Sequence, residues 1–116
     1  MPGRMLHRAD LSRANLSSVK LTGADLQAAQ LRTADLSYAN LEDVDLGGAN
    51  LRAANLKGAL LNGANLSLSD LRDADLGHAS FQGANLNGAK LNGAKLGRAI
   101  WVDGQVCADG SVGRCL

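Results

Sequence analysis

The chain has little of what builds an ordinary globular core. Its 116 residues include one Trp, one Tyr, one Phe and one Pro, so large rings contribute little to packing. It also has no apolar run of the roughly 18 residues needed to span a bilayer. Lys and Arg total 12 against 11 Asp and Glu, and this net charge of +1 does not point to nucleic acid or a membrane surface. We therefore expect a protein partner, and neither nucleic acid nor membrane.

Signals of catalysis and export are missing as well. No Ser, His and acid constellation, GxGxxG turn, P-loop or HExxH segment occurs in the sequence. The chain is therefore predicted not to be an enzyme, and no cofactor is expected. No charged segment followed by an apolar one opens the sequence, which favours a cytoplasmic protein.

What the sequence does contain is a repeat of period five. Leu occupies eighteen of the twenty positions reached in steps of five from Leu6, and Phe81 and Trp101 fill the other two. Two residues before each of these centres, Ala occupies sixteen of twenty positions. The exceptions are Arg4, Val19, Val44 and Ser69. The position just before the centre favours Asp or Asn, so the unit is A-(D/N)-L-x-x and the chain is one repetitive domain.

The five-residue step excludes an α-helix. At about 100° per residue, each Leu would lie roughly 140° from the previous one and no apolar face would form. In an extended segment, Ala and Leu point to one side and the intervening Asp or Asn to the other. Because five is odd, the two residues after each Leu must turn the chain, and they are rich in Gly, Ser, Asn and Asp.

A chain that turns after every repeat forms a coil, and successive coils stack about 4.8 Å apart. Arg32, Arg52 and Arg72 recur at intervals of twenty, as expected for four repeats per coil. Segments such as 24–26, 34–36 and 84–86, which read ADL, ADL and ANL, closely resemble the consensus of the pentapeptide-repeat family. The resemblance implies an all-β fold, a right-handed quadrilateral β-helix of about five coils of twenty residues.

Two regions follow from this assignment. The β-helix is expected over residues 4–103 and a cysteine-containing C-terminal cap over residues 104–116. The buried centres are expected to include Leu46, Leu51, Leu56, Leu61, Phe81 and Trp101, the last as a plug at the end of the Leu column. Arg4 falls at an inward position, so the first coil is expected to be frayed or incomplete.

Cys107 and Cys115 enclose seven residues in the tail. Members of the family with similar tails cap the solenoid with a disulfide, and such a bond also fits an exported chain. Two free thiols in a reducing cytosol are the alternative. A metal site is disfavoured because no CxxC spacing occurs and the two histidines, His7 and His78, fall in different coils.

Function must lie on the outward residues. The column of Arg32, Arg52 and Arg72 is either a site for an anion or acidic partner or a solvated face, and Asp70 and Asp73 are close enough to relieve Arg72. Two further candidates are an acidic cluster and an apolar pair on one face. They are Glu42, Asp43 and Asp45, and Leu60 with Ile100.

Three functions remain open. The first is a structural or protein-interaction module of a bacterial type, monomeric or weakly dimeric through a coil end, with an unknown protein target. The second, implied by family members that mimic DNA, is a modulator of DNA gyrase or topoisomerase, and the near-neutral charge disfavours it. The third is a consensus-like or truncated sequence without a selected partner.

Overall fold

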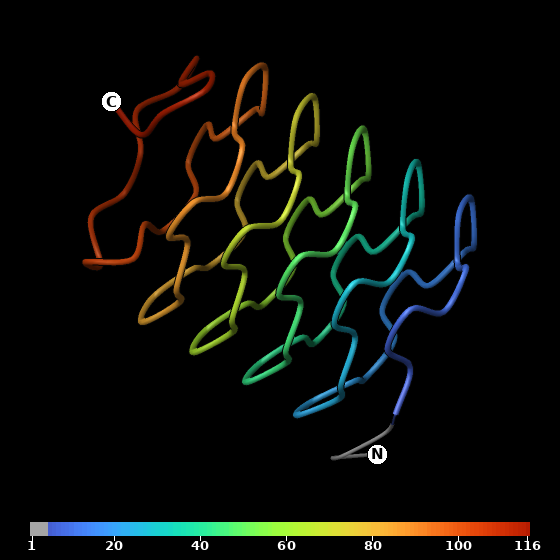
Figure 1. Cartoon of the computed structure of the whole chain (residues 1–116). Coiled ribbons are helices and arrows are strands. Elements are labelled where there is room, and N and C mark those ends of the chain that lie inside the picture. Colours follow the sequence, from blue (N-terminus) through green and yellow to red (C-terminus); the bar gives the residue numbers. More distant parts are fainter. Residues whose placement is uncertain (1–4) are drawn as a thin grey trace.

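The computed structural model describes residues 5–116, which wind into a solenoid of stacked coils 35 Å long and 25 by 22 Å across (Figure 1). Within this range there is no helix, and the regular elements are single-residue β-bridges. The members of the parallel bridges lie at every fifth position from Met5 to Ile100. The prediction that helix is absent is therefore confirmed for the described residues. The inward position expected for Arg4 lies outside them.

Backbone hydrogen bonds fix how the coils stack. The N–H of Leu26 donates to the carbonyl of Asp45 over 2.7 Å, and the N–H of Asp45 donates to the carbonyl of Ala24 over 3.0 Å. The same pattern recurs along the chain, and the parallel bridges join residues twenty apart, such as Asp25 with Asp45. Up to Ser80, each residue therefore lies beside the one that follows it by twenty positions.

The turn between repeats has a constant conformation. The N–H of Ala29 donates to the carbonyl of Leu26 over 3.0 Å and closes the turn. The second residue of each turn, from Arg8 to Arg98, has a positive φ. This holds for Gly48 at 66° and for Ala28 at 56° alike. Non-glycine residues rarely adopt this conformation. This conformation agrees with the prediction from the sequence that the two residues after each Leu turn the chain.

Asp and Asn before each centre support these turns. An oxygen of the Asp45 side chain accepts a hydrogen bond from the N–H of Gly47 over 3.0 Å, and Asn50 accepts one in the same way from Arg52 over 3.1 Å. Such Asx turns stabilise a local reversal of the backbone. The preference for Asp and Asn thus comes from the turn, a role that the sequence reasoning did not assign.

The core is a continuous column of Leu and Ala inside the coils. The centres Leu46, Leu51, Leu56, Leu61 and Phe81 are fully buried. The Ser69 side chain, one of the exceptions to Ala, is also buried and donates to the carbonyl of Leu66 over 2.7 Å, so its hydroxyl is satisfied.

The last centre differs from the others. Trp101 is only partly buried, and its ring meets that of Phe81 edge-on with the centroids 5.7 Å apart. At the other end, Leu6, Leu11 and Leu16 are partly exposed, because no preceding coil covers them among the described residues. The ends of the Leu column are therefore less well covered than its middle.

Candidate interaction face and C-terminal cap

The three arginines of the predicted column lie in successive coils at one corner of the solenoid. The N–H of Thr33 donates to the carbonyl of Arg52, and that of Ala53 donates to the carbonyl of Arg72. The N–H of Arg13 donates to the carbonyl of Arg32 over 3.0 Å, which brings a fourth guanidinium group to the same corner. Arg13 was missed by the sequence reasoning because it does not share the twenty-residue spacing.

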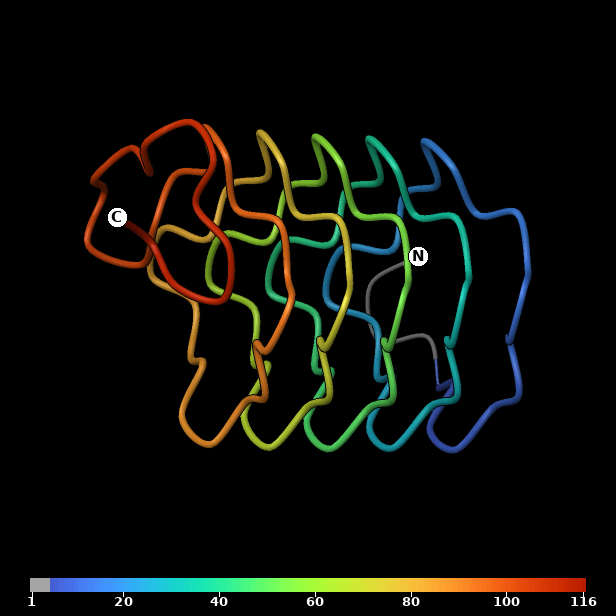
Figure 2. The same ribbon diagram turned by 90° about the horizontal axis from the view of Figure 1, so that it is seen from above.

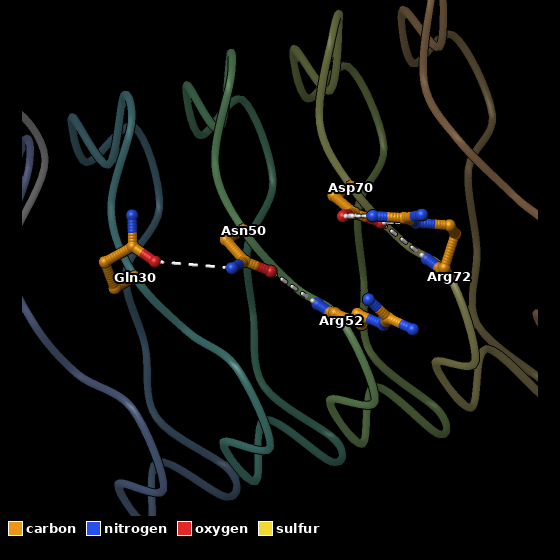
Figure 3. A network of polar contacts seen from close by, with 5 residues as sticks. All are labelled: Gln30, Asn50, Arg52, Asp70 and Arg72. Atoms are coloured by element: carbon orange, nitrogen blue, oxygen red, sulfur yellow. Dashed lines mark hydrogen bonds and ion pairs between the residues drawn. The ribbon is translucent and has the colours of Figure 1, made fainter.

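The charge of Arg72 is neutralised by Asp70 of the same repeat. Its Nε donates to one oxygen of Asp70 over 2.9 Å and its terminal nitrogen donates to the other over 2.7 Å (Figure 3). These bonds, above all other causes, lower the pKa of Asp70 from 3.8 to about 2. The same carboxylate, and more weakly Asp73, raises the pKa of Arg72. Arg72 is thus held in a bidentate ion pair.

Arg32 and Arg52 have different neighbours. At the place where Asp70 stands in its coil, their coils carry the neutral amides Gln30 and Asn50 (Figure 3). The Asn50 amide nitrogen donates to Gln30 over 3.3 Å, so the two amides bond to each other along the column. Within residues 5–116, neither Arg32 nor Arg52 takes part in a salt bridge. Two adjacent guanidinium groups therefore lack a carboxylate partner in this part of the chain.

An open depression adjoins Arg32. It is lined by Asp10, Ser12, Arg13, Arg32 and Thr33. The N–H of Ser12 donates to Asp10 over 3.1 Å, and hydrogen bonds from the backbone and then the side chain of Ser12 lower the pKa of that carboxyl. The depression thus contains one carboxylate engaged in its own turn, two guanidinium groups and two hydroxyl groups.

The predicted acidic cluster divides into two parts. Asp45 accepts hydrogen bonds from Gly47, from the Asn65 amide over 3.0 Å and from the Gln27 amide, so it is occupied in its own column. Glu42 and Asp43 lie in the turn after Leu41, and Asp43 is exposed. Since turns two repeats apart lie on opposite corners of a four-repeat coil, these two acids face away from the arginine corner.

The predicted apolar pair is not contiguous. Leu60 and Ile100 share a column, but Ser80 lies between them and bridges to both. Leu60 is 41% exposed, whereas Ile100 is only partly exposed and pairs with Val106 of the tail. This arrangement gives no continuous apolar contact surface.

The tail folds back onto the last coil (Figure 2). Antiparallel bridges join Lys95 to Val112 and Ile100 to Val106, and the N–H of Cys107 donates to the carbonyl of Ala99 over 2.8 Å. A disulfide joins Cys107 to Cys115, with the Cα atoms 4.9 Å apart.

The tail covers only part of the end of the solenoid. Leu96 lies under it and is buried, whereas Leu86 and Leu91, the two earlier centres of the last coil, stay partly exposed. On the outer surface, Arg98 of the last coil forms a salt bridge with Asp109 of the cap at 2.7 Å, and both side chains are exposed.

No group of three metal-ligating side chains occurs within residues 5–116. The same residues include no helix long and apolar enough to cross a membrane.

Comparisons with known proteins agree on one family. The family model of pentapeptide repeats matches with 8 copies over residues 9–48, 29–67, 49–88 and 69–100. No curated protein sequence matches the chain.

Among solved structures, the pentapeptide repeat protein Rfr23 from the cyanobacterium Cyanothece 51142 is similar, with 41% identity and a TM-score of 0.78. The match covers 79% of this chain and 63% of Rfr23, so the chain spans less than two thirds of that relative. The pentapeptide repeat protein AT2G44920 from the Arabidopsis thaliana thylakoid lumen is 28% identical, with a TM-score of 0.85 over 97% of this chain and 83% of its own.

QnrB1, a plasmid-mediated fluoroquinolone resistance protein, is 20% identical over 78% of this chain and 59% of its own. Its TM-score of 0.48 is too low to support an argument about function. The family match and the two closer folds identify the solenoid as a right-handed β-helix. The chain belongs to the pentapeptide repeat family.

Proposed function

We propose that the chain is a non-catalytic interaction module, a four-sided β-helix of about five coils over residues 4–103 with a cap at residues 104–116. The observation that supports this proposal is the register of twenty residues, which aligns outward side chains in columns on a stiff backbone. Such a surface presents charges at fixed spacing to a protein partner.

The absence of catalytic motifs from the sequence supports a non-catalytic role. The near-neutral net charge of +1 gives no support to DNA mimicry at gyrase, which needs a strongly negative surface. An oxidised Cys107–Cys115 pair fits an exported chain, whereas reduced thiols fit the cytosol.

The test is affinity capture from the source organism with the folded chain as bait and the thermally unfolded chain as control. We expect a captured protein that binds the folded bait alone and that, once purified, forms a complex of defined stoichiometry by calorimetry. A supercoiling assay with DNA gyrase runs in parallel. Inhibition of supercoiling, or the lack of any partner specific to the folded chain, would contradict the proposal.

A further inference from the structure

We propose that Arg13, Arg32 and Arg52 bind an extended acidic segment of a partner protein. This inference rests on the proposed role as an interaction module and names the chemistry of its partner. The three residues form what we call the open arginine corner, in contrast to Arg72, which is closed by its own carboxylate.

The first support is the local distribution of charge. Segments 27–34 and 47–54, which carry Arg32 and Arg52, contain no Asp or Glu, whereas segment 67–74 carries Asp70 and Asp73 around Arg72. Of the turns that carry Arg32, Arg52 and Arg72, only that of Arg72 has a carboxylate of its own, whereas Arg13 has Asp10 at the corresponding position of its repeat. The backbones of Arg32 and Arg52 lie one coil apart, about 4.8 Å along the axis, so their like charges repel each other and an anion near both would be stabilised.

The second support is the way the neutral neighbours are held. Asn50 accepts the N–H of Arg52 over 3.1 Å and donates to Gln30 over 3.3 Å, so its amide is fixed by two bonds and offers no negative charge. The Asx turn therefore forms without a carboxylate that could pair with the guanidinium group of Arg52. The guanidinium groups of Arg32 and Arg52 remain available to an outside acceptor.

The third support is the extent of the corner. Arg13, Arg32 and Arg52 span two coil steps, about 10 Å at the usual strand spacing. A single carboxylate or phosphate is too small to contact all three arginine side chains. About three residues of an extended chain cover this length. The depression at Arg13 and Arg32, which Ser12, Thr33 and Asp10 also line, forms part of this corner. An acidic peptide running along the solenoid axis is the ligand that fits.

The test uses the full chain with its disulfide and a fluorescein-labelled polyglutamate peptide, with binding measured by fluorescence anisotropy at low and high ionic strength. We expect salt-sensitive binding. Arg32→Gln combined with Arg52→Gln should weaken it by about tenfold, as expected for loss of two charge contacts at the surface. The matched control is Lys57→Gln combined with Arg114→Gln, which removes two exposed positive charges elsewhere and should change binding by less than about twofold.

A second variant moves one carboxylate without changing the net charge. Asn50→Asp combined with Asp70→Asn keeps both Asx acceptors but transfers the carboxylate from the coil of Arg72 to that of Arg52. Arg52 should then pair with the carboxylate introduced at position 50 and Arg72 should lose its partner, which leaves Arg13 and Arg32 in adjacent coils and Arg72 two coils from Arg32. We expect binding to fall by about threefold, because one contact next to Arg32 is lost. Circular dichroism melting curves should show that each variant remains folded.

Several results would overturn the inference. These are equal losses in the two double variants, an unchanged affinity after the carboxylate swap, or displacement of the peptide by inorganic phosphate at equal concentration. Self-association that depends on Arg32 and Arg52 would also overturn it, because Glu42 and Asp43 of a second copy would then be the ligand. A partner captured equally by the wild type and by the Arg32→Gln, Arg52→Gln variant would leave the interaction role intact and reject this site alone.

Discussion

The phenol ring of Tyr38 lies over Gly58, the residue at the same turn one coil further on. A β-carbon added at Gly58 would lie 2.5 Å from Cε1 of that ring. The same relationship joins three other pairs of turn residues twenty positions apart. They are Asp43 with Gly63, Leu68 with Gly88, and Asp73 with Gly93. In these four pairs the Gly leaves the space that the side chain of the preceding coil occupies.

Gly58→Ala should therefore destabilise the protein more than Gly48→Ala. Both glycines have positive φ, 69° and 66°, so the cost of placing Ala in a left-handed backbone is similar in the two variants. Nothing, however, lies within 4 Å of a β-carbon at Gly48. We expect the Gly58 variant to lose about 1 to 3 kcal/mol more, measured by urea unfolding. Adding Tyr38→Ala should remove most of this difference. Equal losses in the two single variants would mean that the ring moves aside freely.

Leu56→Ala should cost about 2 to 5 kcal/mol in unfolding free energy, because Leu56 is fully buried and its truncation leaves a cavity in a narrow core. Leu60→Ala is the control, since Leu60 is 41% exposed on the outer surface and should lose less than about 1 kcal/mol. A loss under about 0.5 kcal/mol for Leu56→Ala would contradict its burial.

Reduction of the Cys107–Cys115 disulfide should lower stability by roughly 2 to 3 kcal/mol, the loop-closure entropy of a short loop. Mass spectrometry of the unreduced protein should show a deficit of two hydrogen atoms, and the melting temperature should fall on addition of a reductant. Cys107→Ala combined with Cys115→Ala should melt at the reduced value and should not respond to the reductant. A reductant effect of the same size in this variant would show that the disulfide is not its cause.

The Asp70–Arg72 pair should make stability depend on pH in the acid range. Hydrogen bonding to Arg72, chiefly through its side chain, lowers the pKa of Asp70 to about 2. Since the folded pKa lies below the unfolded value of about 3.9, the contribution of the pair is complete above about pH 4 and is lost as the pH falls through about 2. Urea unfolding at several pH values should show a smaller acid loss for Asp70→Asn and for Arg72→Gln than for the wild type. An identical pH profile in all three proteins would exclude this linkage.

Much of the fold could be predicted from the sequence because the repeat period of a solenoid determines which residues form its core. The alternation of Ala and Leu in steps of five determines which side chains point inward, and Leu51 or Leu56 needs no knowledge of distant contacts to be placed there. The family match agrees with this prediction. Trp101 was harder to place, since its burial depends on the tail and the tail has no period.

The candidate site was only partly accessible to such reasoning. The column of Arg32, Arg52 and Arg72 follows from spacing, but the difference between them depends on whether position 30, 50 or 70 carries an amide or a carboxylate. The signal was present two residues before each arginine, in the Asx position of the turn. Arg13 could not be found by spacing at all, because it reaches the corner from the second turn position of its repeat.

The register of twenty residues means that the core and the surface of this protein follow different rules for insertion. One extra five-residue repeat between Arg32 and Arg52 would keep every Leu and Ala in phase, yet it would carry Arg52 to the next side and part it from Arg32. Four extra repeats would lengthen the molecule by a whole coil and return both arginines to one column. Insertion of a single repeat therefore preserves the pattern of the core. Only insertion of a whole coil also preserves the columns of outward side chains.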